Sequence, residues 1–128
     1  MDLRYESVRI AEILLNRIKA YHLTKKDTDL LITYGNLSKQ LDMGIRPRNL
    51  DRPLGDLSDY CIEACNLPRL SALVVNQSDY MPGDGFFTYF YAGSPHEKWE
   101  SIFIHELNSI KKSRNWHKLA ESLHITIL

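Results

Sequence analysis

The sequence lacks long apolar runs, a net charge and a cysteine pair suited to a disulfide. No apolar run approaches the roughly 18 to 20 residues that a membrane span requires, and the N-terminus lacks the apolar centre of a signal peptide. Sixteen basic residues balance sixteen acidic ones, so the net charge neither favours nor excludes nucleic acid as a partner. We therefore expect a cytoplasmic protein with no membrane partner.

Neither the thiols nor the imidazoles have the spacing of a covalent or metal site. Cys61 and Cys65 lie one turn apart on a predicted helix, where parallel side chains disfavour a disulfide and favour reduced thiols. His96, Glu100 and His105 offer three metal ligands, but nine residues of helix turn the two imidazoles about 180° apart. We predict no metal and no cofactor.

Most of the chain has the apolar periodicity of amphipathic helices. Its 128 residues, 44% of them hydrophobic and 25% charged, suit one globular domain spanning residues 1–128. Thr33 is placed to cap a short helix, and Pro53 is tolerable only in the first turn of the next. The predicted helices are residues 5–21, 34–41, 50–65, 95–112 and 116–123, with a short strand at 30–33.

The exception is the segment 70–91, which has the composition of a β-hairpin. Residues 70–75 form an apolar, β-branched first arm, residues 76–85 hold turn formers, and residues 86–91 are rich in aromatics. A lone hairpin is marginal in water, so helices must cover it and the strand at 30–33 can pair with it. We therefore predict an α+β, winged-helix-like fold in which helices pack on a small antiparallel β-hairpin sheet, with extra N- and C-terminal helices.

Two motifs resemble a known family. Residues 32–41, Ile-Thr-Tyr-Gly-Asn-Leu-Ser-Lys-Gln-Leu, resemble the TYG-x-L-A opening of the DNA-binding domain of alkylguanine-DNA alkyltransferases and alkyltransferase-like proteins, and residues 70–75 are similar to that family's active-site strand. Ser71 stands where the alkyl-accepting cysteine would be, and a serine hydroxyl without a base is no substitute for a thiolate. The resemblance therefore implies a winged-helix scaffold without alkyl transfer. The chain is also similar to small bacterial and phage proteins with the pattern LP-x-L-x-ALVVN and PG-x-GF.

Two basic stretches are candidate nucleic-acid contacts. The first holds arginines and an asparagine before and within the start of the helix 50–65, where a winged-helix protein reads the major groove; Asp51, Asp56 and Asp59 follow at once and oppose phosphate. The second is basic with a neighbouring Trp116 and suits contact with a nucleic-acid backbone. The predicted DNA-contacting residues are Tyr34, Arg46, Arg48, Asn49, Arg52, Lys111, Lys112 and Arg114.

A protein partner is the alternative to double-stranded DNA. Small size, zero net charge and an aromatic-rich arm suit an immunity protein, an antitoxin or an inhibitor of a bacterial defence system, with contacts through Phe87, Tyr89, Tyr91 and Trp116. No nucleophile with its base can be identified, and Asp84 is better explained as a turn residue. We therefore expect a non-catalytic, winged-helix DNA-binding module of bacterial or phage origin.

Overall fold

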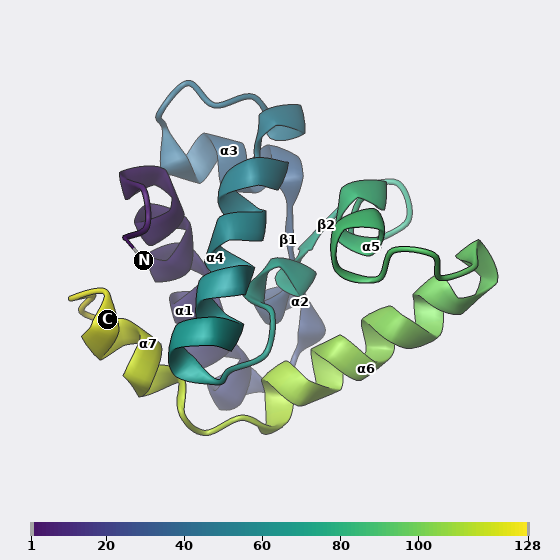
Figure 1. Ribbon diagram of the computed structural model, residues 1–128. Helices are drawn as coiled ribbons and strands as arrows, with labels where there is room; N and C mark the ends of the chain where they lie inside the picture. The colour runs from purple at the N-terminus through teal and green to yellow at the C-terminus, as the bar shows by residue number, and fades with distance from the viewer. Residues whose placement is uncertain (1, 128) are drawn as a thin grey trace.

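Helices account for most of the fold in residues 2–127, the part of the chain that the computed structural model describes (Figure 1). The α-helices are α1 (Tyr5–Thr24), α2 (Asp27–Leu30), α3 (Tyr34–Leu41), α4 (Asp51–Cys65), α5 (Asp84–Phe90), α6 (Trp99–Lys112) and α7 (Trp116–Ser122). Three 3₁₀ turns lie between them: η1 (Pro47–Asn49), η2 (Leu70–Leu73) and η3 (His96–Lys98). Two short strands, β1 (Ile32–Thr33) and β2 (Val74–Val75), form the sheet.

Local signals explain where α3 and α4 begin and end. The Thr33 side chain accepts a hydrogen bond from the backbone N–H of Asn36 at 3.2 Å, which confirms the predicted cap of α3. Pro53 lies in the first turn of α4, as predicted, because the first turn needs no intrahelical donor there. Asn66 ends α4 in the left-handed conformation with φ of 53°, a role that asparagine fills well.

The core lies between α1, α4 and the segment that carries η2 and β2. Helix α1 places Ile10, Leu14 and Ile18 on its buried face, and all four residues of η2 are buried. Arg17 fastens α2 to α1 because its guanidinium donates hydrogen bonds to the carbonyls of residues 28, 30 and 31 at the end of α2. Figure 1 shows α7 beside α1, and α6 passing beneath α5 and running toward the end of the molecule where α7 begins.

The predicted antiparallel hairpin, and with it the winged-helix fold, is wrong. Strand β1 does lie alongside Val74, but the pairing is parallel, with Ile32 opposite Val74 and Thr33 opposite Val75. The second arm of the predicted hairpin is instead helix α5. Its Phe86, Phe87 and Phe90 recur at helical spacing and form an aromatic cluster, so tertiary packing overrides their preference for strands.

None of the helices within residues 2–127 combines the length and the apolar character needed to cross a lipid bilayer.

Candidate functional site

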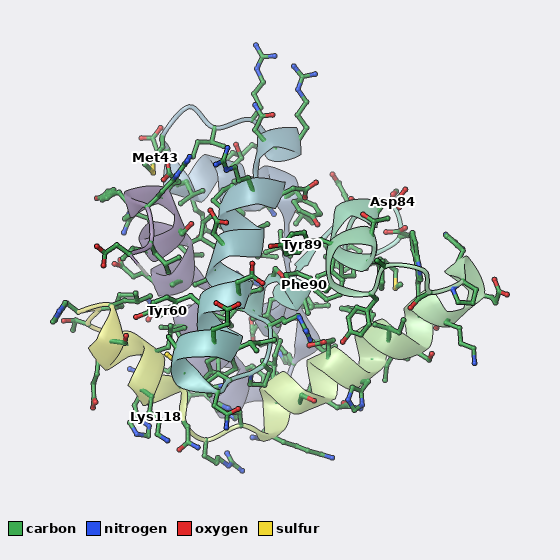
Figure 2. All side chains as sticks on the ribbon, viewed as in Figure 1. Met43, Tyr60, Asp84, Tyr89, Phe90 and Lys118 are labelled. Carbon is green, nitrogen blue, oxygen red and sulfur yellow. The ribbon has the colours of Figure 1, made fainter. Side chains whose placement is uncertain are left out.

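A cleft of about 420 Å³ lies between α4 and α5, and we call it the α4–α5 cleft. Figure 2 shows Tyr89 and Phe90 in the space between these two helices. Aromatic rings and a few polar groups share the lining, which is the usual composition of a ligand site. The lining residues are Tyr34, Asp51, Arg52, Leu54, Gly55, Asp56, Ser71, Gly85, Phe86, Tyr89 and Phe90.

Two glycines let the start of α5 approach the starts of α3 and α4. The hydroxyl of Tyr34 accepts a hydrogen bond from the backbone N–H of Gly83 at 2.9 Å, and a Cβ at residue 83 would lie 3.2 Å from that oxygen. A Cβ at Gly85 would lie 2.7 Å from Oδ2 of Asp51, closer than side chains tolerate. In the turn predicted from residues 82–85, a Cβ at either glycine would therefore require the neighbouring Tyr34 or Asp51 side chain to shift.

The polar groups of the cleft retain unused hydrogen-bonding capacity. Burial raises the pKa of Tyr34 to about 12, so its phenol stays protonated at neutral pH. Burial also raises the pKa of the Asp51 carboxyl group, which lines the cleft, above its usual value. Within residues 2–127 the Tyr34 O–H has no acceptor and the Asp51 carboxylate has no donor or cation partner. A ligand in the cleft can therefore both accept from Tyr34 and donate to Asp51.

Ser71, at the floor of the cleft, is held by a second serine. The Ser58 hydroxyl donates to the Ser71 oxygen at 2.7 Å and accepts the backbone N–H of Ser71 at 3.0 Å. Both residues are buried, and no imidazole or carboxylate hydrogen-bonds to this pair in the described residues. The contacts of Ser71 are those of a packed structural hydroxyl.

Three arginines lie in residues 46–52, just before and at the start of α4, and we call this stretch the arginine segment. Arg46 and Arg48 are exposed on η1 and its cap, and Arg52 is exposed in the first turn of α4, where it also lines the cleft. Among the residues that the structure describes, none of the three forms a hydrogen bond or an ion pair within the chain. Asn49, also exposed, lies between them.

The second predicted basic patch lies elsewhere and is partly neutralised. Lys111 pairs with Asp27 at 2.9 Å and lies 5.3 Å from the centre of the Tyr21 ring. Lys112 and Arg114 lie at the end of α6 and in the following connector, at the opposite end of α4 from the arginine segment (Figure 1). The length of α4 corresponds to about 20 Å, so the two basic stretches do not form one surface.

The aromatic residues predicted to contact a protein partner do not form one exposed surface. Phe87 is buried and stacks on Trp99 at 4.4 Å, and Trp116 is buried in the core. Tyr89 is 60% exposed at the cleft, and its hydroxyl donates to Asp59 at 2.5 Å. Only Tyr89 is therefore available on the surface in the way that a partner-binding role requires.

Tyr91 belongs to a partly buried polar cluster that the sequence reasoning missed. Its hydroxyl donates to the Glu106 carboxylate, which also accepts from Arg69 at 2.8 Å. The Arg69 guanidinium packs over the Phe90 ring at 5.0 Å, so the cluster supports one wall of the cleft. A signal was present in the sequence, because Glu106 falls on the apolar face of its helix, where a carboxylate needs a buried partner.

The imidazoles considered as metal ligands, His96 and His105, lie in η3 and in α6. No set of three or more His, Cys, Asp or Glu side chains is gathered for a metal ion in residues 2–127. Cys61 and Cys65 are free thiols, and burial raises the pKa of Cys61 to about 12.

No protein-family model, curated protein or solved structure matches the chain.

Proposed function

We propose that this protein is a non-catalytic DNA-binding module whose arginine segment contacts the phosphate backbone at the mouth of the α4–α5 cleft. The supporting observation is the exposure of Arg46, Arg48 and Arg52 without a partner in the described residues. Guanidinium groups bind phosphate oxygens through paired, charge-assisted hydrogen bonds and fix the protein on the duplex. Three such groups within seven residues give a compact backbone contact.

The chemistry of the cleft supports a base, rather than a phosphate, as its occupant. The carboxylates of Asp51 and Asp56 repel phosphate, whereas Phe86, Tyr89 and Phe90 offer ring faces for stacking. The free Tyr34 donor and the Asp51 acceptor suit the polar edge of a heterocycle. A nucleobase that has left the stack combines a planar face with such an edge.

The backbone contact is tested by fluorescence anisotropy with a labelled duplex of random sequence over about 50 to 200 mM salt. We expect the affinity to fall steeply with salt, and Arg48→Ala to lower the slope of log affinity against log salt by about 1. Lys112→Ala is the matched control, since it removes an exposed basic side chain at the other end of α4. Absence of binding at low salt, or an equal loss in both variants, would refute the proposal and leave a protein partner as the remaining hypothesis.

The cleft is tested with duplexes that carry one unpaired base. Such a base has a lower cost of unstacking, so we expect tighter binding than to the fully paired duplex. Asp51→Asn should reduce this preference, while Asp42→Asn, an exposed carboxylate outside the cleft, should not. If the two variants change this preference equally, the effect comes from the protein's overall charge, and the cleft does not bind the base.

A further inference from the structure

The α4–α5 cleft carries more negative than positive charge. Asp51 and Asp56 both line it from the start of α4, and neither forms an ion pair or a side-chain hydrogen bond in the part of the chain that the structure describes. Arg52 is the one basic side chain among the described lining residues, and it is exposed. The lining therefore combines two carboxylates with a single guanidinium.

Tyr89 brings a third carboxylate close to the cleft. Its ring crosses from α5 to α4, where a Cβ at Gly55 would lie 3.8 Å from Cε1 of the ring, and its hydroxyl donates to Asp59 at 2.5 Å. This hydrogen bond and the charge of Asp59 raise the pKa of Tyr89, so the phenol keeps its proton at neutral pH. The Tyr89 ring lines the cleft, and a ring face attracts cations because it carries partial negative charge.

Contact with DNA makes the negative charge of the cleft harder to accommodate. In the proposed function Arg52 binds a phosphate, so its positive charge is neutralised outside the cleft. The carboxylates of Asp51 and Asp56 then remain at a surface that faces a polyanion, where like charges repel. An occupant that brings a positive charge into the cleft offsets this repulsion, whereas a neutral base does not.

We propose that the α4–α5 cleft binds a planar aromatic ring that carries a positive charge in preference to the neutral ring of the same shape. On DNA, the occupant is an unpaired base whose ring is positively charged. The identity of the ring as a nucleobase rests on the proposed function, whereas the preference for charge belongs to the cleft and is measurable without DNA.

The charge preference is tested with two small rings of the same shape. The first, 1-methylnicotinamide, is a pyridinium cation, and the second, meta-toluamide, has a carbon atom in place of the charged nitrogen. Each presents an amide that can accept from Tyr34 and donate to Asp51. In NMR titrations at constant ionic strength, followed at the amides of Gly55 and Gly85 in the cleft, we expect the cation to bind about tenfold more tightly.

Two carboxylate variants assign the preference to the cleft. Asp56→Asn removes a negative charge from the lining and should reduce the advantage of the cation to about threefold or less. Asp42→Asn, which changes an exposed carboxylate outside the lining, should leave the tenfold advantage unchanged. Equal affinities of the two rings for the parent protein, or an equal loss in the two variants, would overturn the proposal.

A comparison of two duplexes separates this proposal from the DNA proposal. One carries an unpaired 1-methyladenine, whose ring is positively charged at neutral pH, and the other an unpaired N6-methyladenine, which has the methyl group without the charge. We expect tighter binding of the first duplex. Equal binding of both would overturn the charge preference on DNA, while binding of the pyridinium without binding of either duplex would support the preference and refute the DNA proposal.

Discussion

The contact between Gly85 and Asp51 predicts that the effect of Gly85→Ala depends on residue 51. Alanine is favoured over glycine in a helix by about 0.5 to 1 kcal/mol. The new Cβ would lie 2.7 Å from Asp51 Oδ2, so the carboxylate must rotate away. An off-rotamer side chain costs about 0.5 to 1.5 kcal/mol, so the two terms nearly cancel in the natural chain.

Removing the Asp51 carboxylate should reveal the preference of a helix for alanine over glycine at residue 85. In an Asp51→Ala background we expect Gly85→Ala to stabilise the fold by about 0.5 to 1 kcal/mol, measured by urea unfolding as a double-mutant cycle. Gly35→Ala is the control, because Gly35 occupies the same second position of α3 and has nothing within 4 Å of an added Cβ. It should stabilise equally in both backgrounds. The steric explanation is refuted if Gly85→Ala, like Gly35→Ala, stabilises the fold equally with Asp51 and with Ala at residue 51.

Three further predictions concern the polar groups that hold the helices in place. Glu106→Gln should destabilise the fold by about 3 kcal/mol in urea unfolding, because it leaves Arg69 partly buried without its counter-ion, whereas Arg69→Met with Glu106→Leu should cost less. Tyr34 and Tyr91 each have a pKa of about 12 in the folded protein, against 10.0 for an ordinary tyrosine. The folded state thus holds these protons more tightly, so their stabilising contribution is complete below pH 10 and is lost as the pH rises through 12. In an absorbance titration, part of the phenolate signal should appear only near pH 12, and that part should be smaller in Tyr34→Phe. Ionisation of every tyrosine near pH 10 would contradict this. Thr33→Ala should cost about 1 kcal/mol through loss of the α3 cap, and no change in the urea midpoint would exclude that role.

The sequence was informative wherever local chemistry decides the structure. The apolar period of α1, the Thr33 cap and the position of Pro53 each predicted a helix or its boundary, because these signals act within one or two turns. The segment 70–91 depends on distant contacts instead. Val74 and Val75 are buried on all sides, so their β-branched pattern could not indicate whether the neighbouring strand ran parallel or antiparallel.

The cleft was only partly predictable for the same reason. Tyr34 and Arg52 were singled out from motifs, but no local signal places Asp51 against Gly85, since that contact joins segments far apart in the chain. The turn formers in residues 82–85 predicted a change of direction and could not distinguish a hairpin from the start of α5. The aromatic residues 86–91 then favoured a strand by intrinsic preference, although their burial follows helical spacing.

The parallel ladder between β1 and β2 sets an order of events during folding. It joins residues about forty positions apart through only two pairs of residues, so it contributes little until α3 and α4 have closed the intervening loop. We therefore expect Ile32 and Val74 to pair late in folding. Since Tyr34 directly follows β1 and Ser71 lies in η2 just before β2, transient separation of the ladder would open the floor of the cleft before the helices themselves unravel.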